Sequence, residues 1–210
     1  MAKIEKFKLL ISFIIGTILF IAGFLASNWI VLFGYQRNIE LQQRIGEKIN
    51  LMDSESQIYC ENYQPEISTE LNEAGSFLML LEKKFGKNKP EIILQKENYS
   101  MLELKHFFSV KNYAQKCQKS ITTLLFFYSN KEDYLDDAET KGFIISKLKE
   151  LNPAGIMAYS FDYDLDSDVI RNLKDAYNVQ KPNTAVINDK IILEQFNDID
   201  DLTPYTQAKS

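Results

Sequence analysis

The chain has 210 residues, a net charge of −5 and the apolar content of a folded protein, so it has room for one ordinary domain with additional elements and is not a disordered chain. Residues 1–34 carry +2, so against the total of −5 the remainder carries −7. This acidic body lacks the basic face that nucleic-acid binding requires, and we therefore expect no nucleic-acid partner.

The longest apolar stretch lies close to the N-terminus. No residue from Leu9 to Gln36 is charged, and three lysines precede this stretch. A helix needs about 20 apolar residues to cross the hydrocarbon core of a bilayer. We therefore predict a basic segment at 1–8 and a transmembrane helix at 9–34 that holds the chain in the lipid bilayer of the cell membrane.

Cleavage and orientation of this helix are two separate questions. The apolar run continues past the small pair Ala26-Ser27 and exceeds the roughly 7–15 residues of a signal-peptide core, which favours a single-pass anchor over a cleaved signal. The lysines before the helix favour a cytoplasmic N-terminus and an extracytoplasmic body. This preference is small, because Arg37, Arg44 and Lys48 follow the helix.

Residues 35–119 have the pattern of a helical region. Apolar residues recur three or four positions apart within three segments, which we expect to be helices: 37–60, 67–85 and 90–119. Gly86 suits the end of the second segment, and Pro90 suits the first turn of the third. The third segment is either one helix or two helices separated by a break near Asn98. We expect the second and third helices to pack as a hairpin, and the first to be a stalk or an arm for self-association.

The remainder, 120–210, alternates strands and helices. We predict strands at 121–128, 156–161, 184–187 and 190–193, and helices at 138–151, 168–177 and 199–207. The first strand is apolar throughout, as expected of a strand buried on both faces, and Asn188-Asp189 suits a two-residue hairpin turn. The fold class expected is α/β, with a central mixed four-stranded sheet in the order βαβαββα.

This order of elements resembles the core of the thioredoxin fold over residues 121–210. Pro182 stands just before the third strand, where that family places a cis-proline beside its active site. The segment Val186-Ile187-Asn188-Asp189-Lys190 is similar to the family's VINGK-type turn. The resemblance implies that the loop after the first strand is the functional loop of the domain.

The reactive cysteine pair of that family is missing here. Residues 129–138 contain no cysteine, and Asp133, Asp136 and Asp137 stand in the region instead. Carboxylates complement a helix N-terminus but cannot attack a disulfide. The resemblance therefore implies a redox-inactive domain without catalytic residues, used for protein binding or envelope scaffolding. The candidate residues of a groove that holds a protein or peptide partner are Pro182, Asn183, Thr184, Asn130, Asp136 and Asp137.

The two cysteines of the chain, Cys60 and Cys117, precede this domain. An extracytoplasmic body favours a structural disulfide between them, whereas two buried free thiols, or thiols kept reduced in the cytosol, are the alternatives. The alternative function is a divergent thiol–disulfide oxidoreductase that uses this pair or handles a partner's thiols.

An acidic run at Asp162–Asp168 places a carboxylate at every second position, as the first ligands of an EF-hand do. Ser167 and Leu173 stand where that motif needs its glycine and its glutamate, so capping of the following helix is the simpler interpretation. His106 is the only histidine, and one histidine makes no zinc site by itself. We expect no metal and no cofactor.

Overall fold

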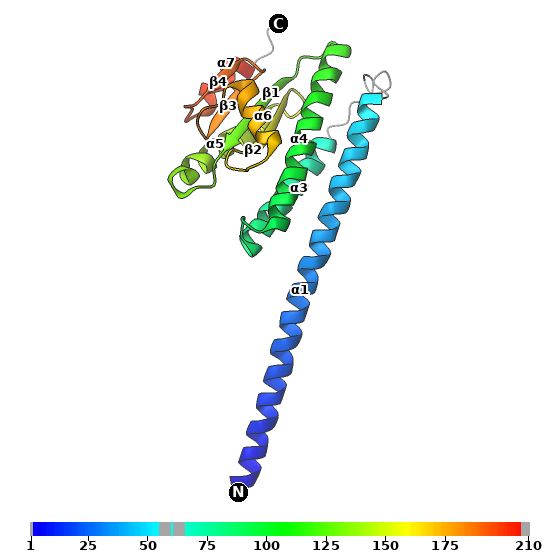
Figure 1. Cartoon of the computed structure of the whole chain (residues 1–210), viewed down its shortest axis with the longest axis vertical. Coiled ribbons are helices and arrows are strands. Elements are labelled where there is room, and N and C mark those ends of the chain that lie inside the picture. Colours follow the sequence, from blue (N-terminus) through cyan, green and yellow to red (C-terminus); the bar gives the residue numbers. More distant parts are fainter. Residues whose placement is uncertain (1, 55–59, 61–65, 207–210) are drawn as a thin grey trace. The chain divides into compact units, whose positions relative to one another are not determined.

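The computed structural model describes residues 2–54, 60 and 66–206 (Figure 1). The chain divides into two compact units, Met1–Glu40 and Leu41–Ser210. Helix α1 spans Ala2–Ser54, so its first part forms the first unit and its last part belongs to the second. The division of the chain into the ranges 1–8, 9–34, 35–119 and 120–210 stays a prediction.

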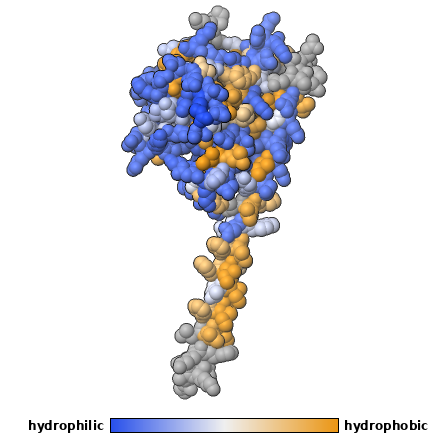
Figure 2. Space-filling model, viewed as in Figure 1, coloured by the Kyte–Doolittle hydropathy of each residue, from blue (hydrophilic) through white to orange (hydrophobic). Residues whose placement is uncertain are grey.

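The first unit is the apolar part of α1. By length and composition, one helix among the described residues can cross a membrane, and the stretch concerned lies within Leu10–Met52. Its apolar side chains are exposed along the helix (Figure 2), as at Phe13, Phe20 and Trp29. The predicted long apolar helix near the N-terminus is thereby confirmed, whereas its insertion in a bilayer and its orientation stay predictions.

Helix α1 continues without a break to Ser54, where we predicted a separate helix over 37–60. The reason is that Gly34 alone interrupts the pattern, and a single glycine costs a helix only about 1 kcal/mol. Ile45, Ile49 and Met52 are buried in the second unit. The prediction for residues 55–59 lies outside the described residues.

Helices α3 (Glu66–Phe85) and α4 (Pro90–Lys116) form the predicted hairpin. Gly86, with a φ of 89°, ends α3 in a left-handed conformation that favours glycine. Helix α4 runs unbroken through Asn98 and ends at Lys116 rather than at 119, because Cys117 forms its C-cap.

The sheet contains β1 (Thr122–Tyr128), β2 (Ile156–Asp162), β3 (Thr184–Ile187) and β4 (Ile191–Leu193) in the order β2-β1-β3-β4. Strand β1 is parallel to β2 and antiparallel to β3, and β4 is antiparallel to β3. Asn188, Asp189 and Lys190 connect β3 to β4, because Ile187 pairs with Ile191. The predicted two-residue turn is therefore one residue too short, and β4 begins at Ile191 rather than at Lys190. Asn188 and Asp189 have φ values of 50° and 60°. The predicted mixed α/β class and mixed four-stranded sheet are confirmed.

Helices cover both faces of this sheet (Figure 1). On one face, α5 (Glu132–Leu151), η1 (Ile199–Asp201) and α7 (Thr203–Thr206) close a core around Leu124 and Phe126. On the other face, α4 and α6 (Asp168–Tyr177) close a core around Leu125, Phe127 and Tyr159. Each β1 side chain therefore enters one of two cores, which explains why the strand is apolar throughout.

Three predictions for helices in this region are wrong. Helix α5 begins at Glu132 rather than at Ala138, because Glu132 and Asp133 suit the first turn of a helix and extend it towards β1. Phe143, which we placed inward, is 72% exposed. The predicted helix over 199–207 is the 3₁₀ turn η1 followed by the short α7, and residue 207 lies outside the described residues.

Candidate functional site

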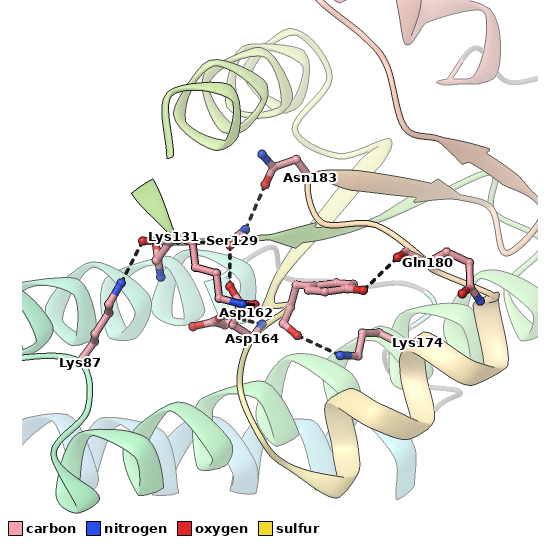
Figure 3. A network of polar contacts seen from close by, with 10 residues as sticks. Lys87, Ser129, Lys131, Asp162, Asp164, Lys174, Gln180 and Asn183 are labelled. Atoms are coloured by element: carbon pink, nitrogen blue, oxygen red, sulfur yellow. Dashed lines mark hydrogen bonds and ion pairs between the residues drawn. The ribbon is translucent and has the colours of Figure 1, made fainter. Parts of the chain in front are cut away.

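The loops that follow the two parallel strands meet at one edge of the sheet. Ser129 follows β1, and Asp164 follows β2 by two residues. The Ser129 Oγ donates a hydrogen bond to Asp164 Oδ2 at 2.5 Å, and the Lys131 Nζ lies 2.6 Å from Asp164 Oδ1 (Figure 3). Because this edge lies at the carboxyl ends of the parallel strands β1 and β2, it is the edge where open α/β sheets commonly place ligands.

Asn183 joins three segments at this edge. Its side chain is buried and its φ is 57°, a left-handed value that asparagine tolerates. Its Oδ1 accepts a hydrogen bond from the Ser129 backbone N–H at 3.0 Å, in the direction seen in Figure 3. Its Nδ2 donates to the Tyr134 carbonyl at 2.9 Å and to Asp137 Oδ2 at 2.7 Å. The segment before β3 is thereby fixed to the end of β1 and to the start of α5.

Lys141 fixes the same segment from within α5. The residue is only 1% exposed, and its Nζ donates to the carbonyl oxygens of Asn183 at 3.1 Å and Glu194 at 2.7 Å. The same nitrogen lies 3.0 Å from Asp137 Oδ2 and 5.2 Å from the centre of the Phe196 ring. We call the connected set the polar junction; it consists of Ser129, Lys131, Asp137, Lys141, Asp164 and Asn183.

The electrostatics of the polar junction argue against nucleophilic catalysis. Burial acts to raise the pKa of Asp164, but hydrogen bonds from Lys131 and Ser129 outweigh it, so the net pKa lies below its ordinary value. The hydrogen bond to Asp164 raises the pKa of Lys131. At neutral pH the pair is therefore ionised, and Ser129 donates to a weakly basic carboxylate. An activated serine instead needs a base with a pKa near the working pH.

Among the six predicted groove residues, Asn183 and Asp137 contact each other. The Thr184 Oγ donates to the Lys181 carbonyl at 2.9 Å. The Asn130 carbonyl accepts from the Lys87 Nζ at 2.9 Å (Figure 3). Asp136 is exposed and Pro182 is half-buried, with a trans peptide before it. Several of these polar groups are thus engaged within the domain.

Five residues at and beside the polar junction form what we call the loop surface; it consists of the exposed Lys131, Tyr134, Leu135 and Lys181 and the half-buried Pro182. Tyr134 and Leu135 are 41% and 37% exposed. Their helix turn lies beside the segment that contains Pro182, because Asn183 Nδ2 donates to the Tyr134 carbonyl. The loop surface therefore combines apolar side chains with two lysines, which pair with Asp164 and with Glu194 at 2.6 and 2.7 Å, on a rigidly held base.

The cysteines lie elsewhere in the body. Cys60 and Cys117 are joined in a disulfide with a Cα–Cα distance of 5.4 Å, and no described cysteine is free. Cys117 precedes the start of β1, whereas the polar junction follows its end. A strand of this length spans about 20 Å. The one disulfide that the structure describes is therefore at the other end of β1 from the polar junction.

The carboxylates of Asp162–Asp168 are engaged within the body, both locally and over long sequence distances. Asp162 forms a buried ion pair with Lys96 of α4, and Asp164 belongs to the polar junction. The Ser167 hydroxyl caps α6 by accepting a hydrogen bond from the Ile170 N–H at 3.3 Å, and Asp162 Oδ1 accepts from the Asp164 N–H at 2.9 Å. Within the described part of the chain, no group of three or more histidine, cysteine, aspartate or glutamate side chains is placed to hold a metal ion.

Sequence reasoning missed four members of the polar junction: Ser129, Lys131, Lys141 and Asp164. A usable signal existed for two of them, because Ser129 and Asp164 each follow a strand that the sequence predicts to be parallel to the other. The burial of Lys141 had no such signal, since lysine is almost never fully buried unless it is paired.

Comparison with known proteins identifies no relative from which a role for this site could be inferred. No protein-family model matches the chain, and no curated protein and no solved structure matches it. The geometry of the polar junction and the loop surface is therefore the basis for any functional proposal.

Proposed function

We propose that this chain is a single-pass membrane protein that displays a redox-inactive thioredoxin-like domain for binding a protein segment. Support for the thioredoxin-like assignment comes from the strand order β2-β1-β3-β4 with one parallel and two antiparallel pairs. Pro182 supports it by its position two residues before Thr184, the first residue of β3, although its peptide bond is trans rather than cis. The domain begins at β1 and uses the loop surface to contact its partner.

One observation carries this proposal. At the end of β1, where the thioredoxin family keeps its dithiol, the structure has the polar junction, in which Asn183 bonds to Ser129, Tyr134 and Asp137. This arrangement contains no thiol and no activated nucleophile, but it holds Tyr134 and Leu135 exposed on a fixed base. A rigid scaffold that positions exposed loop side chains is typical of a binding site.

The proposed location rests on two features. The apolar part of α1 is long enough to cross a bilayer, and the lysines before it favour a cytoplasmic N-terminus. The Cys60–Cys117 disulfide supports an extracytoplasmic body, because disulfides persist in oxidising compartments. We therefore infer an anchor at 9–34 in the cell membrane and a body outside the cytoplasm.

Site-specific photo-cross-linking in native membranes tests the binding proposal. A photoreactive residue replaces Leu135 in the full chain, or Lys181 in a second variant. We expect both positions to form an adduct of the same mass with one protein partner. The matched control is Lys147, which is also exposed and also lies on α5. Adducts that form equally well from Lys147, or none from Leu135 and Lys181, would contradict the proposal.

A further inference from the structure

A buried carboxyl group connects α4 to the outer edge of the sheet. Glu103 is only 5% exposed, and its Oε1 accepts a hydrogen bond from the Ser160 backbone N–H of β2 at 3.1 Å. The Tyr99 hydroxyl donates to the same oxygen at 3.3 Å. Strand β2 is an edge strand, so its outward N–H groups have no strand partner on that side. Glu103 therefore supplies an acceptor that a neighbouring strand would otherwise provide.

The second carboxyl oxygen of Glu103 faces a different environment. Glu103 Oε2 is buried and has no hydrogen-bond partner in the described part of the chain. Beside Glu103 lies a polar cavity with room for about one water molecule. Its polar walls come from α3, α4, α5 and β2, through Ser68, Asn72, His106, Lys149 and Tyr159. Because Glu103 lines this cavity, a proton on Oε2 or a water molecule in the cavity would complete its hydrogen bonds.

The groups around Glu103 leave its ionised form poorly compensated. On α4 itself, His106 Nδ1 is hydrogen-bonded to the Tyr159 hydroxyl of β2 at 3.1 Å, and burial lowers the pKa of His106 to about 4, so the ring is neutral. Strand β1 contributes Tyr128, and α3 contributes Ser68 and Asn72, all uncharged at neutral pH. Helix α5 contributes Lys149, whose Nζ donates to Asn72 Oδ1 at 3.4 Å. Among the described residues that line this cavity, Lys149 is the one cation.

We propose that Glu103 is a proton-controlled latch between α4 and the edge of β2. With its proton bound, the carboxyl group accepts from Ser160 and Tyr99 through Oε1 and donates from Oε2 into the cavity. When the proton is lost, a buried charge remains that Lys149 compensates only in part, and the contact between α4 and β2 opens more often. This inference does not depend on the proposed binding function.

The raised pKa of Glu103 supports the latch. Burial raises the pKa of Glu103 to about 8, although the hydrogen bonds from Ser160 and Tyr99 and the charge of Lys149 act in the opposite direction. Between pH 4.5 and 8, Glu103 therefore keeps its proton in the folded state, whereas it has lost it in the unfolded chain, where its pKa is near 4.5. Consequently the closed latch becomes less stable relative to the open state as the pH rises from about 4.5 to about 8. Above that range its stability no longer changes with the protonation of Glu103.

His106 acts in the opposite sense over a lower pH range. Its pKa is about 4 in the folded protein and 6.5 ordinarily, so its contribution to folding increases as the pH rises between those values. Below pH 6.5 the two contributions therefore oppose each other. The net weakening of the latch is expected between pH 6.5 and 8, where Glu103 titrates and His106 stays neutral.

Nuclear magnetic resonance on the full chain in detergent micelles tests the latch. The carboxyl ¹³C shift of Glu103 should titrate near pH 8. The protection factor of the Ser160 amide, corrected for the intrinsic pH dependence of exchange, should fall about tenfold or more between pH 6.5 and 9. Glu103→Gln keeps the acceptor oxygen but cannot ionise, so its Ser160 protection should not change with pH. Lys149→Met removes the compensating cation and should move the Glu103 midpoint to higher pH.

Glu91→Gln, at an exposed position of the same helix, is the matched control and should behave as the unmodified chain. The latch is overturned if the Glu103 carboxyl carbon titrates at the ordinary pH of a glutamate. It is also overturned if Ser160 protection is independent of pH in the unmodified chain. If Glu103→Gln fails to fold, the carboxyl titration of the unmodified protein and of Lys149→Met still decides the question.

Discussion

Replacing Lys141 with methionine is expected to lower the free energy of unfolding by about 3 kcal/mol. Methionine retains the apolar stem but provides no donor for the carbonyl oxygens of Asn183, which is buried, and Glu194, which is half-buried. Each buried acceptor left without a partner costs about 1–3 kcal/mol. The loss also frees the segment before β3, so the loop surface should lose its fixed geometry. Denaturant unfolding of the full chain in detergent measures the change.

Lys147→Met is the matched control for this substitution. Lys147 lies on the same helix, but it is exposed and pairs only with Glu150 at 2.9 Å, three residues further on. Exposed pairs of this kind contribute at most about 0.5 kcal/mol. A Lys141→Met variant as stable as Lys147→Met would show that Lys141 does not hold the polar junction together.

Removing the disulfide is expected to have the largest effect on stability. The bond joins residues separated by 57 positions, and the chain-entropy relation gives about 4 kcal/mol for closing a loop of that length in the unfolded state. The variant with both Cys60 and Cys117 replaced by serine should therefore unfold at a much lower denaturant concentration.

The reductant dithiothreitol provides the control for this prediction. Added to the unmodified protein, it should reproduce the destabilisation of the serine variant, and it should leave the serine variant itself unchanged. Equal migration of the reduced and unreduced protein on a denaturing gel would show that the bond does not form. Equal unfolding midpoints for the oxidised protein and the serine variant would show that it does not stabilise the body.

The sheet could be predicted from local pattern because each strand carries its own signal. The run from Thr122 to Tyr128 is apolar on both faces, and Asn188-Asp189 is a turn pair that accepts left-handed backbone. The strand order and the pairing of β1 with β3 depend on contacts between distant segments. The sequence therefore indicates a mixed sheet, and the structure adds the order.

The start of α5 was not predictable by the same means. The sequence interpretation began this helix at the first clear apolar pattern, near Ala138, whereas the first turns of α5 hold exposed Tyr134 and Leu135 and several carboxylates. An exposed helix start has no apolar stripe to reveal it. The misplaced boundary also placed Asp136 and Asp137 in a loop, although they lie within the helix.

The polar contacts were still harder to infer. Lys141 and Glu103 look like ordinary members of polar helix faces, and their burial depends on backbone carbonyl and amide groups of distant strands and loops. No regular spacing of residues in the sequence indicates those partners. Asn183 was singled out because of its place after Pro182, and the structure adds the partners that fix it.

A thiol–disulfide exchange assay decides whether this domain works without redox chemistry. The full chain in detergent is mixed with insulin and dithiothreitol, and insulin reduction is followed over time. The account predicts the same rate as dithiothreitol alone, both for the unmodified chain and for the variant with Cys60 and Cys117 replaced by serine. Faster reduction by the unmodified chain that disappears in the serine variant would contradict the account and assign the protein to the oxidoreductases.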